Sequence, residues 1–298
     1  MTLPTSADVS AAADRIRGRA RRTPVLRAEL DGSPLVLKLE LVQLTGSFKI
    51  RGALNALLGG SRPDRVVTAS GGNHGLAVAT AARLLDLPAT IYVPEPTPAV
   101  KADAIAATGA KLVRGGASYA EAAEAAQADA DGARYLPAYD DPLVVAGQGT
   151  LAAEVVADAP DVDNLVVAAG GGGLAAGTVL GSGGRNVVVV EPEGCSAVHQ
   201  ALKAGRPVDT RVASVASSAL GATRVGEIPF AVLKDADIRS VLVSDEEILA
   251  ARDVLWSHFR LAVEPAAAAP LAAWLAGRVP GELPCLVVCG ANAAWTPA

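Results

Sequence analysis

Short apolar runs rich in valine, leucine and isoleucine alternate with alanine-rich stretches along almost the whole chain. Strands that are apolar throughout, each followed by a helix, indicate parallel sheets covered on both faces. This alternation constrains the fold more than any other feature, and it predicts an α/β protein. The expected strands are Leu35–Glu40, Arg65–Ala69, Ala89–Val93, Lys111–Val113, Leu165–Ala169, Asn186–Glu191 and Cys285–Cys289. The expected helices are Phe48–Leu58, Gly75–Leu85, Val100–Ala107, Tyr119–Ala130, Gly147–Ala157 and Asp245–His258.

The expected strands fall into two groups, one between about residues 65 and 113 and one from residue 165 onward. We interpret this as a smaller α/β domain, residues 61–142, inserted into a larger one made of residues 1–60 and 143–298. The uncharged stretch Leu165–Gly184 is long enough to resemble a membrane span. Its many glycines and its place between two apolar runs favour a strand, a loop and a helix instead.

Composition limits the possible partners and the compartment. Hydrophobic residues make up 51% of the 298 residues and charged residues 19%, which excludes a disordered chain. The net charge is −5 and no basic stripe interleaves with aromatic residues, so we expect no nucleic-acid partner. The three cysteines lack metal-ligand spacing, and residues 1–20 lack the apolar core of a signal peptide. We therefore expect a cytoplasmic protein that binds no membrane.

One lysine lies in an unusual setting. Thr45 or Ser47 is expected to cap a helix whose first turn contains Lys49. The positive end of a helix dipole disfavours an ammonium group, so the amine would be freer to attack a carbonyl. The alternative is an ordinary surface lysine, but the neighbours Phe48 and Ile50 do not resemble a solvated face.

The segment Ser70-Gly71-Gly72-Asn73-His74 follows an expected strand and precedes an expected helix. Such a turn exposes backbone N–H groups at a helix N-terminus, which suits a carboxylate or a phosphate. The Asn73 amide could reach a ring oxygen. A plain connector, with His74 at a helix start, is an equally good interpretation of the segment by itself.

Four consecutive glycines, Gly170–Gly173, follow another expected strand. Because glycine is costly in backbone entropy, close approach of the backbone to a phosphate explains them better than a simple turn. The run also satisfies the dinucleotide-binding pattern up to Ala175, and Glu191 ends the next strand at about the 20-residue distance expected of a ribose-binding acid. An NAD-dependent dehydrogenase is therefore a rival hypothesis, although it leaves the Lys49 segment unexplained.

The last candidate is Cys289, at the end of the strand nearest the C-terminus. A thiol there could face a ring nitrogen as a weak, neutral partner. The alternative is a small buried hydrophobic residue, which is the more frequent role of a free cysteine.

Together these segments resemble the fold-type-II pyridoxal-phosphate (PLP) enzymes, whose fold is like that of the tryptophan synthase β chain. The resemblance is to the group of threonine and serine dehydratases and serine racemases. It covers most of the chain and rests on segments in the order of the group: Thr45–Ala53, Ser70–His74, Ala146–Thr150, Gly170–Gly173, Glu264-Pro265 and Cys289–Asn292.

The resemblance implies a role for each matched residue. Lys49 would form the Schiff base and then act as base on the substrate Cα. The implied cofactor contacts are Phe48, Lys49, Asn73, Gly170, Gly171, Gly172, Gly173, Leu174, Glu264 and Cys289. The implied substrate contacts are Ser70, Gly71, Gly72, Asn73 and His74. A homodimer is also implied.

The implied reaction is β-elimination, in which L-threonine or L-serine yields a 2-keto acid and ammonia. Alternatives are another PLP-dependent β-elimination, β-replacement or racemisation of a hydroxy-amino acid such as hydroxyaspartate, or a binding protein that has lost catalysis. Racemases of the group carry a second serine where this chain has Gly71, which disfavours racemisation. We expect no metal, since the second carboxylate of the group's metal site would fall at Ala197. Residues 137–141 and 217–221 also depart from the group, which leaves the preferred amino acid open.

Overall fold

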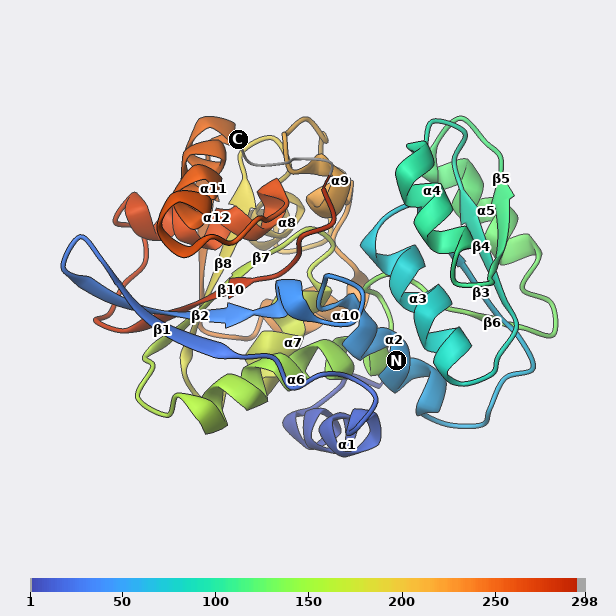
Figure 1. The fold of residues 1–298 in the computed structure, drawn as a ribbon, viewed down its shortest axis with the longest axis horizontal. Helices are drawn as coiled ribbons and strands as arrows, with labels where there is room; N and C mark the ends of the chain where they lie inside the picture. Colours follow the sequence, from blue (N-terminus) through green and yellow to red (C-terminus); the bar gives the residue numbers. More distant parts are fainter. Residues whose placement is uncertain (1, 294–298) are drawn as a thin grey trace.

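The computed structural model describes residues 2–293 and places two β-sheets side by side (Figure 1). The larger sheet has six strands in the order β1 (Val25–Leu30), β2 (Ser33–Leu39), β10 (Pro284–Val288), β7 (Asn164–Ala168), β8 (Asn186–Pro192) and β9 (Ile238–Val243). The smaller sheet has four strands in the order β5 (Lys111–Arg114), β4 (Ala89–Val93), β3 (Val66–Ala69) and β6 (Arg134–Tyr135). All strands of the smaller sheet lie between strands of the larger one in sequence, which confirms the inserted arrangement. The residue bounds predicted for the two domains stay a prediction.

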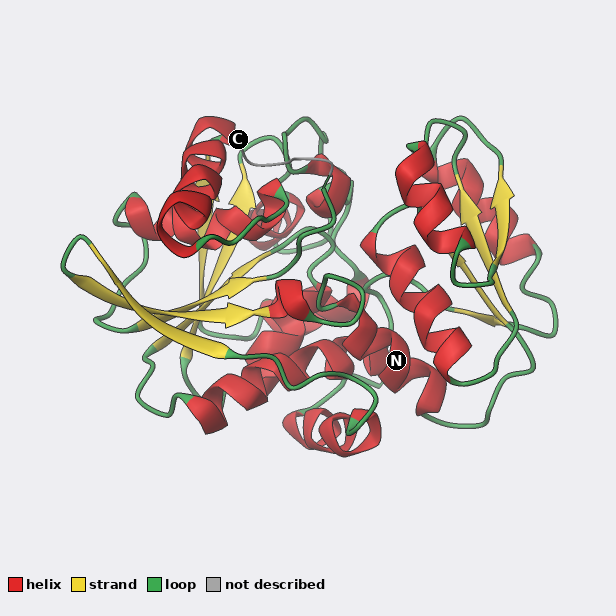
Figure 2. Ribbon diagram, viewed as in Figure 1, coloured by secondary structure: helices red, strands yellow, loops and turns green. Residues whose placement is uncertain are grey.

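Helices cover both faces of each sheet (Figure 2). They are α1 (Ser6–Ile16), η1 (Glu40–Val42), α2 (Lys49–Leu58), α3 (Asn73–Leu84), α4 (Ala99–Ala106), α5 (Tyr119–Ala128), α6 (Pro142–Asp158), α7 (Gly173–Gly181), α8 (Ala197–Ala204), α9 (Ser217–Leu220), α10 (Glu227–Leu233), α11 (Asp245–Phe259) and α12 (Pro265–Leu275). Successive residues of a strand point to opposite faces. Accordingly Val66 packs with α3 and α4, whereas Val67 packs with α5.

The expected α/β class is confirmed, with one correction to the parallel sheets. Every strand pair is parallel except β1 with β2, which form an antiparallel hairpin at one edge of the larger sheet. Asp31 and Gly32 turn this hairpin with φ angles of 51° and 78°. The sequence signal was the Asp-Gly pair, which favours such a two-residue turn.

All seven expected strands and all six expected helices overlap observed elements. The strands that pattern analysis missed are β1, β6 and β9, which lie at sheet edges where burial is incomplete. The stretch Cys195–Phe230, where no strand or helix was expected, contains α8, α9 and most of α10. The stretch Leu165–Gly184 forms β7, a loop and α7, as expected, and no helix among residues 2–293 is long and apolar enough to cross a bilayer.

Helix α2 connects the two halves of the molecule. Its residues Ile50, Leu54 and Leu57 belong to the same buried cluster as Val78 of α3 and Ile91 of β4. Its opposite side packs against α6, where Gly52 donates a backbone hydrogen bond of 3.2 Å to Gln148. The helix that begins with Lys49 is therefore fixed from both sides.

Candidate active site

Lys49 is the first residue of α2, and the predicted cap is wrong. The N-cap residue is Phe48, with no side-chain hydrogen bond, and the Oγ of Ser47 has no partner among the described residues. The segment is held instead by the C-terminal strand region, because Ser47 pairs with Gly290 and the Phe48 N–H donates to the Cys289 carbonyl at 3.2 Å. Pairing with the C-terminal segment thus satisfies the Phe48 N–H and fixes the start of α2, a role that we expected a local N-cap to fill.

The Lys49 amine lies in a poorly solvated position. Its Nζ donates to the Ala138 carbonyl at 2.9 Å and lies 5.2 Å from the centre of the Phe48 ring. Burial lowers the pKa of Lys49 to about 8, against the opposing influence of Cys289 and Glu264. A larger fraction of this amine is therefore neutral near pH 7 than of a solvated lysine, which is what a nucleophile requires.

The segment Ser70–His74 forms the turn between β3 and α3, and α3 begins at Asn73, two residues earlier than expected. The Ser70 Oγ accepts a hydrogen bond from the Gly72 N–H at 3.2 Å. Gly71 has little free space, since a Cβ added there would lie 2.7 Å from the Thr97 side chain. The space that a serine at position 71 would need is therefore filled by Thr97.

His74 is buried and neutral. Burial, together with the Lys49 charge, lowers the pKa of His74 to about 3. Its Nε2 lies 3.1 Å from the Leu136 carbonyl, which can only accept, so Nε2 carries the ring proton and Nδ1 is a buried acceptor without a partner in residues 2–293. His74 is thus placed beside the candidate site as an acceptor and not as an acid.

Asn73 connects to two residues from distant parts of the chain. Its Nδ2 donates to the Glu264 Oε1 at 2.8 Å, and its Oδ1 accepts from the Asn292 Nδ2 at 2.8 Å. Glu264 is 3% exposed, and burial raises the pKa of its carboxyl group even though Asn73 opposes the shift. In the sequence Asn292 is only the last residue of the Cys289–Asn292 segment, and no pattern indicates a role for it.

Cys289 directly follows β10 and is 3% exposed. Burial is the main cause that raises the pKa of its thiol far above the ordinary value. The thiol is therefore neutral at physiological pH, as expected of a weak partner for a ring nitrogen. Cys289 and Glu264 both influence the pKa of Lys49, so these three side chains lie in one neighbourhood.

The four glycines form the turn from β7 into α7, with Gly172 at φ 87° as the N-cap. A Cβ at Gly171 would overlap the Tyr139 ring, and one at Gly173 would lie 2.9 Å from the Tyr139 Cβ. A Cβ at Gly170 would lie 3.0 Å from the Leu220 Cα. The glycines are thus required by neighbouring protein, and the first N–H groups of α7 have no acceptor within their own helix and could bind an anionic group.

The position of Glu191 contradicts the dinucleotide-binding hypothesis. It is fully buried, and its two oxygens accept hydrogen bonds from the N–H groups of Val198 and His199 at 2.8 and 2.7 Å. Burial outweighs these bonds and raises the pKa of Glu191 to about 8. A carboxyl group turned into the start of α8 is not free to bind a ribose. Among residues 2–293 no three histidine, cysteine, aspartate or glutamate side chains cluster as metal ligands.

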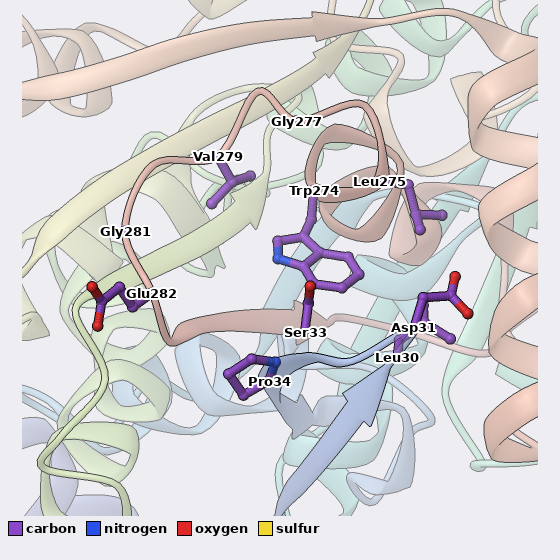
Figure 3. A pocket seen from close by; sticks show the side chains of 10 residues that line it. All are labelled: Leu30, Asp31, Ser33, Pro34, Trp274, Leu275, Gly277, Val279, Gly281 and Glu282. Carbon is purple, nitrogen blue, oxygen red and sulfur yellow. The ribbon is translucent and has the colours of Figure 1, made fainter.

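The candidate residues converge between the two sheets, around the carboxyl ends of β3 in the smaller sheet and of β7 and β10 in the larger one. Parallel sheets bind ligands at the carboxyl ends of their strands. A surface pocket of about 650 Å³ lies at the opposite, amino end of β2 and β10 (Figure 3). There the Trp274 indole lies between Asp31 and Glu282. This pocket contains none of the candidate residues.

Comparisons with known proteins decide between the remaining families. Residues 16–290 match the family model of pyridoxal-phosphate dependent enzymes. The chain belongs to this family. It is 39% identical over 284 residues to an L-threonine ammonia-lyase of Geobacter sulfurreducens, a match that covers 91% of this chain and 71% of that protein. It is 35% identical over 314 residues to the serine racemase of Homo sapiens, covering 96% of this chain and 90% of that protein.

The fold agrees with this assignment. The crystal structure of a threonine deaminase from T.th. superposes with a TM-score of 0.93 at 34% identity, covering 99% of this chain and all of that one. The family implies PLP as the cofactor, and the residues present fit it. The chain offers a poorly solvated amine, a neutral thiol, a glycine turn at a helix N-terminus and two buried polar atoms that have no partner within residues 2–293, the Ser47 Oγ and the His74 Nδ1. The dehydrogenase hypothesis is therefore wrong.

Proposed function

We propose that this PLP-dependent enzyme is an ammonia-lyase that converts L-threonine or L-serine to a 2-keto acid and ammonia. The observation that carries the proposal is the Lys49 amine, whose pKa burial lowers to about 8 at the point where the Asn73, Glu264 and Cys289 segments meet. The threonine ammonia-lyase relative and the threonine deaminase structure support the same reaction.

Different residues of the site have different roles in the proposed reaction. Lys49 would hold the cofactor covalently and later take the Cα proton on its Nζ. The turn at Ser70–Gly72 would bind the substrate carboxylate through backbone N–H groups, Asn73 would donate to the ring oxygen, and Gly170–Leu174 would hold the phosphate. PLP, when bound, withdraws electrons from Cα so that the proton and the β-hydroxyl group can leave.

Cys289 and Gly71 favour elimination over racemisation. A neutral thiol does not keep a pyridine nitrogen protonated as a carboxylate would, which shortens the life of a carbanion and favours prompt β-elimination. Gly71 has no hydroxyl group, and Thr97 fills the adjacent space, so no serine base is available there. Hydroxyaspartate stays an alternative substrate.

We also propose the finer features that the resemblance implies: domain bounds at residues 61 and 142, and a homodimer. A cytoplasmic location is supported by the free, buried state of Cys195, Cys285 and Cys289.

The test uses the purified protein, its Lys49→Ala variant and a Lys203→Ala control at an exposed position of α8. We expect the parent and the control to absorb visible light as yellow proteins and to release keto acid from L-threonine or L-serine. The Lys49→Ala variant should do neither, while its thermal unfolding stays close to that of the parent. A parent that stays colourless after incubation with PLP would contradict the cofactor assignment. A yellow parent that is inert to both amino acids would contradict the substrates.

A further inference from the structure

Three side chains and one backbone carbonyl form a chain of hydrogen bonds at the candidate site. The Asn292 Nδ2 donates to the Thr45 carbonyl at 2.7 Å and to the Asn73 Oδ1 at 2.8 Å. The Asn73 Nδ2 donates in turn to the Glu264 Oε1 at 2.8 Å. These hydrogen bonds join the turn before Lys49, the start of α3, the start of α12 and the segment after β10.

The Thr45 carbonyl fixes the direction of the whole chain. An amide side chain can in principle be turned either way, but a backbone carbonyl only accepts hydrogen bonds. The Asn292 atom that faces Thr45 is therefore the nitrogen, and both of its hydrogens are used, one for Thr45 and one for Asn73. Asn73 must then present its oxygen to Asn292 and its nitrogen to Glu264.

This direction limits what Asn73 can offer to a ligand. Its oxygen is turned toward Asn292 and accepts from it, and one of its two amide hydrogens is donated to Glu264. The second hydrogen is left, so toward the site Asn73 acts as a donor. Glu264 accepts through Oε1 whether it is ionised or carries a proton on its other oxygen, so the direction does not depend on its charge.

Two glycines are needed for the chain of hydrogen bonds to form. Gly46 has φ 69°, and a Cβ there would lie 2.6 Å from the Asn292 Oδ1. A Cβ at Gly290 would overlap the Glu264 Oε1. These glycines flank Lys49 and Cys289 in sequence, so the backbone around the site makes room for this arrangement.

We infer that Asn292 is a positioning residue, which holds the Asn73 amide in the one orientation that donates a hydrogen bond to the ring oxygen of the cofactor. The inference rests on the proposed place of Asn73 at that oxygen. It also assigns Asn292 a second effect, since the bond ties α3 of the smaller α/β unit to the C-terminal segment of the larger one.

The first test is Asn292→Asp, which keeps the shape of the side chain but removes its donor at neutral pH. Asn73 should then turn its nitrogen toward the new carboxylate and lose the orientation that donates to the cofactor. We expect the dissociation constant of PLP to rise at least about tenfold, as for the loss of a hydrogen bond to a charged group. We also expect the bound cofactor to shift its absorption from the visible toward the near ultraviolet.

Asn164→Asp is the matched control. Asn164 is buried and donates to a backbone carbonyl, that of Pro280, at 2.8 Å, but it lies at the amino end of β7. This variant should lose stability in a similar way while it keeps the parent's PLP affinity and spectrum. The comparison separates loss of a buried donor in general from loss of this one.

The second test asks whether Asn292 acts through Asn73. PLP affinity is measured for Asn292→Ala, Asn73→Ala and the double variant. If Asn292 positions Asn73, then Asn292→Ala weakens PLP binding in the parent but adds nothing in the Asn73→Ala background. Additive effects, or an unchanged spectrum and affinity in Asn292→Asp, would overturn the inference. Neither result would affect the Lys49→Ala test, on which the proposed function stands separately.

Discussion

Burial acts in opposite directions on the titratable side chains around Lys49. It lowers the pKa of the lysine and of His74, and it raises the pKa of Glu264 and Cys289. In each case the uncharged form is favoured, because a charge taken out of water is costly. The site therefore gathers an amine that loses its proton more readily than a solvated lysine, a neutral imidazole and a neutral thiol.

The lowered pKa of Lys49 predicts the pH dependence of cofactor capture. The amine is neutral above its pKa, so the rate of covalent PLP binding to the cofactor-free protein should rise with pH and level off above about pH 8. For a solvated lysine the rise would continue to about pH 10. Stopped-flow absorbance between pH 6 and pH 10 measures this rate, with Nα-acetyl-lysine as the reference amine. A protein that follows the reference curve would contradict the effect of burial.

At the scale of elements, α6 lies between α2, which begins with Lys49, and α7, which follows the glycine turn. A Cβ at Gly149 would lie 2.5 Å from the Gly177 carbonyl of α7, so the two helices touch through their backbones. On its other side α6 meets α2 through Arg51. Arg51 is 1% exposed and bonds to Glu40 and to Glu154, each at 2.8 Å.

These ion pairs form a closed, buried group of two acids and two bases. Lys38, 0% exposed, bonds to Glu154 at 2.6 Å, and Glu40 also accepts from Thr23. Arg51 lies only two positions after Lys49, so the group anchors the start of α2. It also gives a physical role to the segment Ala146–Thr150, to which sequence analysis assigned none, because Thr150 accepts from Arg51 at 3.2 Å.

Removal of the Arg51 charge should destabilise the protein strongly. Arg51→Met removes the arginine partner of Glu40 and one of the two cationic partners of Glu154 in a buried environment. We expect a loss of about 3 to 5 kcal/mol in the free energy of unfolding, because a buried charge without its partner is costly. Urea unfolding followed by circular dichroism measures it. Arg27→Met is the control, since the Arg27–Asp161 pair is exposed and its loss should scarcely move the midpoint. Equal effects of the two variants on the free energy of unfolding would show that the buried ion pairs stabilise the protein no more than the exposed pair does.

At the scale of the molecule, the two sheets share one helix. The buried cluster around α2 contains residues of both halves, including Ile16 near the N-terminus, Ile50 of α2 and Ile105 of α4. Separation of the halves would expose this cluster. The inserted unit is therefore bound to the larger one through packing as well as through two chain connections.

This packing predicts a single unfolding transition. Tyr92, Tyr119 and Tyr135 lie in β4, α5 and β6 of the smaller half, whereas Trp256 and Trp274 lie in α11 and α12 of the larger one, so the signals of these residues report on different halves. We expect tyrosine near-ultraviolet circular dichroism and tryptophan fluorescence to give coincident transitions in urea. Two separated midpoints would show that the halves unfold independently and that α2 does not couple them.

The sequence by itself determined the order of the elements and the residue types of the site. Strand and helix periodicities are local, so seven strands and six helices could be placed from pattern alone. Lys49 and Gly170–Gly173 could be identified for the same reason, because a helix start and a run of glycines are features of the local sequence that do not depend on distant residues. Tertiary structure decided the rest. Asn292 meets Asn73 across 219 residues, Tyr139 covers the glycine turn, and Glu191 turns inward against α8. Direction of an amide, burial of a carboxyl group and the pKa of an amine all depend on neighbours in space, which no local pattern specifies.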